Sequence, residues 1–199
     1  MKKTILLIRH GKTENNGKGK YFSGVHDVPL CAKGEKELNS YRGALMLRGI
    51  GAVYTSALCR AVRTAEILLP GIERYCDERL NEVDFGDYEG RVMTDENMHT
   101  DPVFSLWTSR VDRLTFPGGD DVASHACDAV AALYDIASEC NCAKIAVVSH
   151  SATIRLTLSH ILYGDICKFR SIPCSNARVS VLTFDGEAFS VDGVNLPIE

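Results

Sequence analysis

Two short apolar runs constrain the fold of this chain more than any other feature of its sequence. Thr4–Ile8 and Ile145–Ser149 lack the alternation of apolar and polar residues that marks a half-exposed strand. Runs of this kind are typical of strands buried on both faces, which occur almost only in parallel sheets covered by helices. Ala52–Thr55 is predicted as a further strand, and Ile72–Cys76 as a short one.

Segments with apolar residues at helical spacing separate these strands. Helices are predicted over Gly34–Arg48, over 58–69 with Ser56 as N-cap, after a cap at Asp120 or Asp121, and after His150. The alternation of strands and helices predicts an α/β fold, a three-layer α/β/α sandwich around a mostly parallel sheet. Asp185-Gly186 is a turn signal between Val179–Phe184 and Ala188–Val191, and it predicts an antiparallel hairpin at the edge of the sheet.

The segment 80–119 has no regular pattern beyond two short helices around 94–108. No linker, repeat or low-complexity segment divides the chain. Residues 1–199 are therefore predicted to form a single domain.

Composition and charge exclude several classes of protein. The 199 residues are 45% hydrophobic and 24% charged, unlike a disordered or fibrous chain. The net charge of −4 argues against a broad basic surface for nucleic acid. Ile5–Ile8 is too short for a signal peptide or a membrane span, so we expect a cytoplasmic protein with no membrane contact. Eight cysteines without a C-x-x-C pair favour free thiols in a reducing compartment over a metal site.

Cationic and imidazole side chains follow the predicted strands. Arg9 and His10 end the first strand, His150 ends the later one, and Arg60 lies in the first turn of the helix after Ala52–Thr55. Each residue alone is commonly structural, but parallel strands deliver their carboxyl ends to one edge, where ligands bind. We therefore expect these four side chains to lie together. No H-E-x-x-H metal motif or Walker phosphate loop competes with this interpretation.

Five motifs in order make the chain resemble the histidine phosphatase superfamily, whose fold is phosphoglycerate mutase-like. The matching segments are Arg9–Asn16 (R-H-G-x-T-x-x-N), Gly24–Leu30 (G-x-x-D-x-P-L), Ser56–Ala65 (S-x-L-x-R-A-x-x-T-A), Leu80–Gly90 (L-x-E-x-D-F-G-x-x-E-G) and Ser149–Arg155 (S-H-x-x-x-I-R). They extend over nearly the whole chain, which makes the resemblance specific.

The resemblance implies a role for each matching residue and requires neither metal nor cofactor. His10 would attack phosphorus, and Glu82 would protonate the leaving oxygen and then activate water. The phosphoryl group would be held by Arg9, Asn16, Arg60 and His150, with further hydrogen bonds from Ser23 and Ser151.

The chemistry of phosphoryl transfer agrees with these roles. Charge spreads over three equatorial oxygens, and two guanidinium groups with a protonated imidazole can neutralise it without a metal. We expect a neutral His10, because neighbouring arginines disfavour its charged form, and a charged His150. We also expect the substrate's negative charge to favour protonation of Glu82.

Three functions remain open on this fold. Mutases of the superfamily resemble E-R-x-Y-G after the acid, whereas Val83 follows Glu82 here, and the chain is short for a mutase. Segments 84–90, 116–120 and 176–181 resemble α-ribazole phosphatases and related broad-specificity phosphatases. Hydrolysis of a small phosphate ester is therefore expected, with α-ribazole 5′-phosphate as one candidate. The alternatives are a phosphoglycerate mutase and an inactive binding module, although every catalytic group of the family is present.

The sequence leaves open the oligomeric state and whether the loops 17–23 and 91–119 contact substrate.

Overall fold

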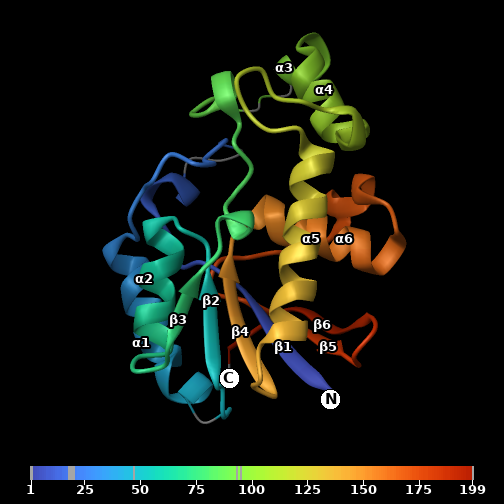
Figure 1. Ribbon diagram of the computed structural model, residues 1–199. Coiled ribbons are helices and arrows are strands. Elements are labelled where there is room, and N and C mark those ends of the chain that lie inside the picture. The colour runs from blue at the N-terminus through green and yellow to red at the C-terminus, as the bar shows by residue number, and fades with distance from the viewer. Residues whose placement is uncertain (1, 18–20, 47, 93, 95, 199) are drawn as a thin grey trace.

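A mixed sheet lies at the centre of the computed structural model, which describes residues 2–17, 21–46, 48–92, 94 and 96–198 (Figure 1). Its strands are β1 (Lys3–Arg9), β2 (Ala52–Thr55), β3 (Arg74–Cys76), β4 (Lys144–Ser149), β5 (Val179–Phe184) and β6 (Phe189–Leu196). Within the described residues their order is β3-β2-β4-β1-β5-β6. The pairs β3-β2, β2-β4 and β4-β1 are parallel, and β5 is antiparallel to β1 and β6. The predicted parallel sheet with an antiparallel edge hairpin is confirmed.

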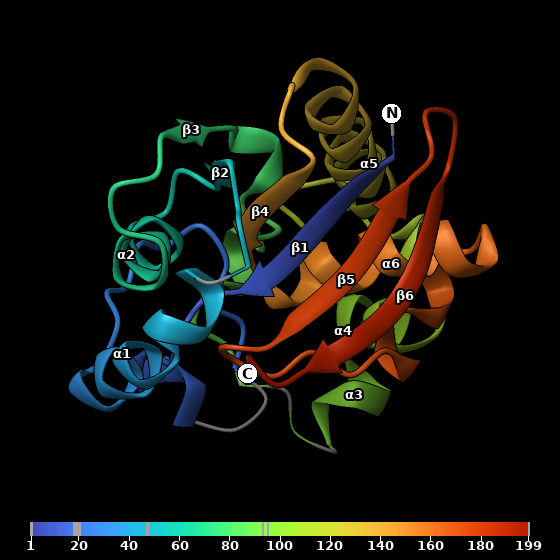
Figure 2. The same ribbon diagram turned by 90° about the horizontal axis from the view of Figure 1, so that it is seen from below.

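Helices cover both faces of this sheet. They are α1 (Ala32–Met46), α2 (Cys59–Leu68), α3 (Asn97–Thr100), α4 (Pro102–Ser109), α5 (Val122–Glu139) and α6 (Ser151–Tyr163). Short 3₁₀ helices are η1 (Glu14–Gly17), η2 (Glu78–Leu80), η3 (Gly86–Tyr88), η4 (Val111–Arg113) and η5 (Ile166–Ser171). Figure 2 shows α1 and α2 on one side of the sheet, and α5 and α6 on the other.

The side chains of β1 explain why its sequence is apolar throughout. Successive side chains of a strand point to opposite faces. Ile5 and Leu7 pack in the core beneath α5 and α6, whereas Leu6 and Ile8 pack in the core beneath α1 and α2. Both faces are therefore buried, and the predicted three-layer α/β/α sandwich is confirmed.

A separate aromatic cluster lies beyond the carboxyl edge of the sheet. It packs side chains of the segment 80–119 against the helix η5. Within that segment, α3 and α4 lie close to the two short helices predicted from the sequence. The ring of Phe22 lies 4.5 Å from that of Phe85, and the ring of Trp107 lies 4.9 Å from that of Phe169. This cluster holds one wall of the site described below.

The first turn of α2 differs from the sequence-based expectation. Its N-cap is Leu58 rather than Ser56, and the carboxylate of Asp27 accepts hydrogen bonds from the Cys59 amide at 2.8 and 3.1 Å. The Cys59 amide, which the predicted Ser56 cap would have satisfied, thus donates to Asp27 instead. This is possible because a loop 32 residues earlier in the chain lies against the helix. The other predicted cap is confirmed at Asp121, which accepts from the Ser124 amide.

Two further observations concern element bounds and membrane contact. β3 begins at Arg74 rather than Ile72, and β6 extends to Leu196. No helix in the described part of the chain is long and apolar enough to cross a membrane.

Candidate active site

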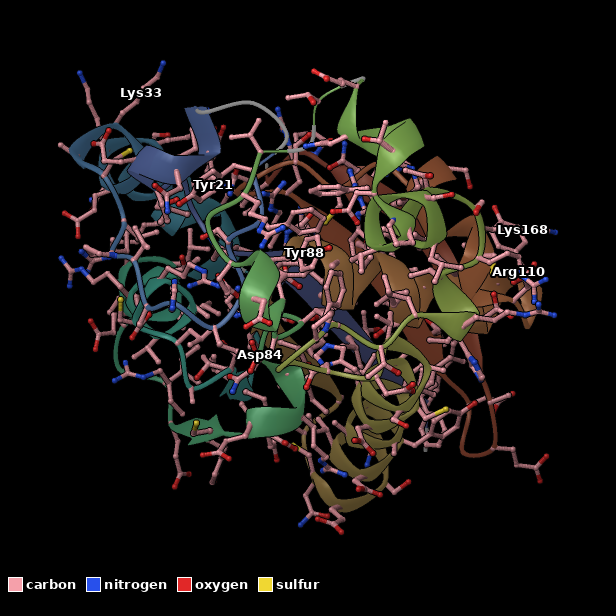
Figure 3. All side chains as sticks on the ribbon, turned by 90° about the horizontal axis from the view of Figure 1, so that it is seen from above. Tyr21, Lys33, Asp84, Tyr88, Arg110 and Lys168 are labelled. Carbon is pink, nitrogen blue, oxygen red and sulfur yellow. The ribbon has the colours of Figure 1, made fainter. Side chains whose placement is uncertain are left out.

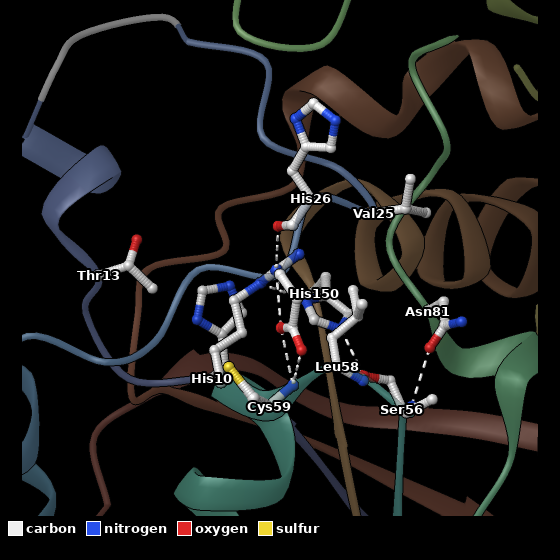
Figure 4. Close-up of polar contacts among 12 residues, drawn as sticks. His10, Thr13, Val25, His26, Ser56, Leu58, Cys59, Asn81 and His150 are labelled. Atoms are coloured by element: carbon white, nitrogen blue, oxygen red, sulfur yellow. Dashed lines mark hydrogen bonds and ion pairs between the residues drawn. The ribbon is translucent and has the colours of Figure 1, made fainter. Parts of the chain in front are cut away.

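His10 and His150 meet because the strands that precede them are paired in register. Arg9 lies opposite Ser149 in the parallel ladder of β1 and β4, and the His10 amide donates to the Ser149 carbonyl at 3.0 Å. The two ring centroids are 5.1 Å apart, and both rings are buried. Figure 4 shows His150 beside Ser56, which follows β2. The edge predicted from the sequence therefore brings the two histidines together.

His10 is neutral and presents one ring nitrogen as a nucleophile. Its Nδ1 lies 2.7 Å from the Gly11 carbonyl oxygen, which only accepts, so Nδ1 carries the proton. The lone pair is then on Nε2. Burial, followed by the charges of Arg9 and Arg60, lowers the pKa of His10 well below its ordinary value of 6.5. The prediction of a neutral His10 is confirmed.

His150 is also neutral, and the expectation of a charged imidazole is wrong. Burial and the charge of Arg60 lower its pKa well below 6.5. Arg60 Nε donates to His150 Nδ1 at 3.2 Å, so that nitrogen is an acceptor. The proton is on Nε2, which donates to Ser56 Oγ at 2.6 Å. Ser56 therefore orients His150, while its Oγ also accepts from the Leu58 amide at 3.3 Å just before α2.

Arg60 is held by three protein acceptors. Besides His150, it donates through Nη1 to the His26 carbonyl at 3.1 Å and through Nη2 to the Gly24 carbonyl at 2.5 Å. A guanidinium has five N–H donors, so two remain for a ligand. The side chain is almost completely buried, which fixes the direction of these donors.

Glu89 holds the loop that orients Arg60. Its carboxylate accepts from the amides of Gly24 and Val25, each at 3.0 Å. A Cβ at Gly24 would collide with Glu89 Oε1 and with the Val83 carbonyl, so only glycine fits there. Glu89 is therefore structural, because its carboxylate is used by these backbone amides.

Two arginines present buried donors that have no acceptor among the residues that the structure describes. Arg9 donates through Nη1 to the Cys174 carbonyl at 2.6 Å, but its Nε is buried without a partner, as is Nε of Arg155. Nearly all buried polar groups in proteins are hydrogen-bonded, so such exceptions call for an explanation. An anion bound in the adjoining cavity would supply the missing acceptors.

Asn16 is oriented by a second asparagine. Asn16 Oδ1 accepts from the Thr13 amide at 2.9 Å and from Asn176 Nδ2 at 3.1 Å, which leaves the Asn16 amide group free to donate. Asn176 Nδ2 also lies 3.0 Å from the His10 carbonyl. Sequence reasoning did not assign Asn176 to the site, because only the sheet order places the start of β5 beside His10.

Glu82 sits on the N-terminus of α6. Its Oε1 accepts from the Val83 amide at 3.2 Å and from the Thr153 amide at 3.0 Å. The Thr153 hydroxyl lies 3.0 Å from the same oxygen and 2.7 Å from the Asn81 carbonyl. Within the described part of the chain, Glu82 Oε2 accepts only from the Ala152 amide, at 3.1 Å. Oε2 meets fewer protein donors than Oε1, so it is the oxygen that can exchange a proton with a ligand.

A chain of hydrogen bonds leads outward from Glu82. The Thr153 hydroxyl lies 3.0 Å from His125 Nε2, and His125 Nδ1 lies 3.0 Å from Asp120 Oδ2. Burial raises the pKa of Asp120, but its hydrogen bonds, chiefly with His125, outweigh this and lower it overall. His125 did not match a catalytic motif, and its contact with Thr153 is visible only in the tertiary structure.

A cavity of about 430 Å³ gathers most of the predicted site. This volume is typical of small-molecule sites. Among the predicted residues, those that line it are Arg9, His10, Asn16, Ser23, Arg60, Glu82 and Ser151. His150 lies behind them, completely buried. The residues that sequence reasoning did not assign are Thr13, Asn15, Tyr21, Phe22, Phe85, Trp107, Ala152, Arg155, Phe169, Arg170 and Asn176.

Both loops whose role was open contribute to this cavity. Tyr21, Phe22 and Ser23 come from the first loop, in which 18–20 lie outside the described residues, and Trp107 comes from the second. Within the described residues, no group of three or more His, Cys, Asp or Glu side chains is placed to hold a metal ion.

Comparisons with known proteins assign the family. The sequence profile of the histidine phosphatase superfamily (branch 1) matches residues 5–197. Phosphoserine phosphatase 1 of Hydrogenobacter thermophilus is 29% identical over 181 residues, which cover 89% of this chain and 85% of that protein. A 2,3-bisphosphoglycerate-dependent phosphoglycerate mutase of Corynebacterium glutamicum is 35% identical over 154 residues, 72% of this chain but 61% of the mutase.

The fold agrees with solved structures. The α-ribazole phosphatase from Shigella flexneri superposes with a TM-score of 0.84 at 22% identity, over 96% of each chain. The resemblance inferred from the five motifs, the fold and the expectation of a phosphatase are confirmed. This chain belongs to the histidine phosphatase superfamily, branch 1.

Proposed function

We propose that the protein hydrolyses small phosphate monoesters through a phosphohistidine at His10, without a metal ion. The observation that carries this proposal is the state of His10: a neutral imidazole with its lone pair on Nε2, in a cavity shared with Arg9, Arg60 and Glu82. An imidazole kept neutral by burial and by cations is a nucleophile suited to an anionic phosphoryl group.

In the first step, Nε2 of His10 attacks phosphorus and the ester P–O bond breaks. The bonding electrons leave with the alcohol oxygen, which takes a proton from Glu82 Oε2. Arg9 and the two unused donors of Arg60 stabilise the charge on the equatorial oxygens. Nδ1 keeps its proton, which stays hydrogen-bonded to the Gly11 carbonyl. The imidazole ring of the phosphohistidine therefore carries a delocalised positive charge beside the phosphoryl dianion.

In the second step, water attacks the phosphohistidine. Glu82 takes a proton from the water, the P–N bond breaks, and its electrons return to Nε2. The sum is ester plus water giving alcohol plus phosphate, with His10 and Glu82 restored. General acid–base catalysis of this kind contributes about 10²–10⁴ in rate.

A mutase is the second candidate, because a phosphoglycerate mutase is among the similar proteins. The residue after Glu82 argues against it. Val83 is completely buried in the aromatic cluster, so this chain places no arginine at the position where mutases of the family resemble E-R-x-Y-G. Isotopically labelled water distinguishes the two: a phosphatase releases phosphate with one labelled oxygen, whereas a mutase returns an unlabelled phosphoryl group to product.

The covalent intermediate is tested by brief incubation with a radiolabelled phosphomonoester, followed by quenching in base. We expect a base-stable, acid-labile phosphoprotein that His10→Ala abolishes, with activity reduced at least about 10³-fold. His160→Ala, at an exposed position of α6, is the matched control and should keep the label. Label that persists in His10→Ala, or activity that is lost in EDTA, would contradict the mechanism.

The substrate belongs to the same proposal. Small esters that include α-ribazole 5′-phosphate, sugar phosphates and phosphoserine form the panel for phosphate release. α-Ribazole 5′-phosphate is suggested by the sequence motifs, and phosphoserine by the name of the relative from Hydrogenobacter.

A further inference from the structure

We propose that Arg155 and Arg170 form a second anion subsite, which binds a carboxylate of the substrate beside the reacting phosphoryl group. The substrate class is then the phosphate ester of a small hydroxy acid. This inference rests on the proposed phosphatase function and deepens it.

The charges that line the cavity exceed what a phosphate ester needs. Four arginines, Arg9, Arg60, Arg155 and Arg170, line it together with a single carboxylate, Glu82. The net charge of these described side chains is three positive. A phosphate monoester brings close to two negative charges at neutral pH. One positive charge is left when Glu82 is ionised, and two when it carries the proton that the first step requires, so a carboxylate on the substrate can neutralise part of this excess.

Arg155 and Arg170 are the two cations that the phosphoryl chemistry does not use. Neither forms an ion pair with a described carboxylate, and Arg155 Nε is buried without an acceptor. The two are close enough to interact: burial first, and then the charge of Arg155, lowers the pKa of Arg170. Two cations that repel each other in one cavity are stabilised by an anion between them. A carboxylate that bridges them also gives Arg155 Nε its missing acceptor.

The position of Arg155 relates this subsite to the phosphoryl position. Ser151 begins α6 and lines the same cavity, and Arg155 follows four residues later on the same face of the helix. Four residues of α-helix span about 6 Å. The short carbon chain of a hydroxy acid can bridge such a distance between its phosphate and its carboxylate.

Arg170 is held in place by the packing of the residue before it. Arg170 lies in η5 next to Phe169, which is buried against Trp107 with ring centroids 4.9 Å apart. Arg170 itself is exposed at the rim, so it can meet an incoming anion. Trp107 and Phe169 supply an apolar wall, and the two arginines supply the charge.

The test compares two esters that differ by one carboxylate, O-phosphoserine and O-phosphoethanolamine. We expect wild-type kcat/KM to favour phosphoserine by about tenfold or more. Arg170→Gln and Arg155→Gln should each lower this ratio about tenfold. Arg155 is partly buried, so its substitution can also disturb folding. Arg170 is exposed, so a changed ratio in Arg170→Gln reports on the subsite rather than on folding.

Lys168→Gln is the matched control. It removes one positive charge two residues from Arg170, but Lys168 lies over the Tyr163 ring and points outward at the edge of the molecule (Figure 3). It should leave the ratio unchanged. A wild-type ratio near one, or the same ratio in wild type, Arg155→Gln and Arg170→Gln, overturns the subsite.

Failure of the subsite is distinguishable from failure of the proposed function. If phosphohistidine forms with both esters without preference, the subsite is wrong and the phosphatase stands. If no ester gives phosphohistidine, the phosphatase proposal is wrong. In that case calorimetric binding of the two esters to His10→Ala still decides the subsite: tighter binding of phosphoserine, weakened by Arg170→Gln, supports it, and equal binding contradicts it.

Discussion

Arg60 Nε donates to His150 Nδ1 across 3.2 Å, and both side chains are almost completely buried. Since Ser56 takes the other nitrogen of His150, the imidazole acts here as an acceptor that orients a guanidinium. The donors of Arg60 that we propose to bind the phosphoryl group are thus directed by a histidine 90 residues away in sequence.

Replacing Arg60 by lysine tests this arrangement. Arg60→Lys keeps the charge but cannot contact His150, His26 and Gly24 while presenting a planar fork to phosphate. We expect kcat/KM to fall about 10²–10³-fold. Arg63→Lys on the same helix is the control, because Arg63 is exposed and pairs with Glu35 and Glu66. Equal, small effects of the two substitutions would show that charge alone suffices.

Stability should depend on pH through the two buried histidines. Their pKa values lie well below the ordinary 6.5, which the unfolded chain retains. Just below pH 6.5 the unfolded state therefore binds more protons than the native state. The free energy of unfolding should fall as pH decreases in this window, with a slope that approaches about 1.4 kcal/mol per pH unit for each histidine as the unfolded chain becomes fully protonated.

Urea unfolding between about pH 5 and 7 measures this dependence. His10→Gln should reduce the slope by the contribution of one histidine, because it removes a site that titrates only in the unfolded chain. His160→Gln, at an exposed position, should leave the slope as in wild type. An unchanged slope in His10→Gln would mean that His10 titrates normally in the folded protein.

Thr153 should matter through Glu82. Thr153→Val removes the hydroxyl that lies 3.0 Å from Glu82 Oε1 and from His125 Nε2. We expect kcat to fall about tenfold for esters with poor leaving groups, and less for good ones, which need little protonation. The control is Thr157→Val, since the Thr157 hydroxyl donates to the Thr153 carbonyl and does not contact Glu82. Equal losses for all leaving groups would indicate a packing defect.

Gly24 should tolerate no side chain. Gly24→Ala places a Cβ against Glu89 and Val83, and this should cost about 1–3 kcal/mol of stability. It should also lower activity, because the Gly24 carbonyl accepts from Arg60. Gly43→Ala is the control: it lies in α1 with open space around it, so it should stabilise the protein slightly. Thermal unfolding and phosphate release measure both effects, and a Gly24→Ala protein that matches wild type would refute the close approach.

The sequence by itself determined the layers of the fold and singled out the residues that we propose as catalytic groups. Apolar runs such as Ile5–Ile8 can only be buried on both faces, and the motifs around His10, Arg60, Glu82 and His150 carry recognisable spacing. Local patterns of this kind depend on neighbours in the chain, so periodicity and motif are enough to find them.

Only the tertiary structure decided how these groups act on one another. The order of the strands sets which loops meet, and local periodicity does not encode it. This order places Ser56 on His150, and it keeps His150 neutral beside Arg60. It also brings Arg155 and Arg170 into the cavity of His10. Burial and long-range contacts set protonation and ligand charge, and both arise only when distant segments pack together.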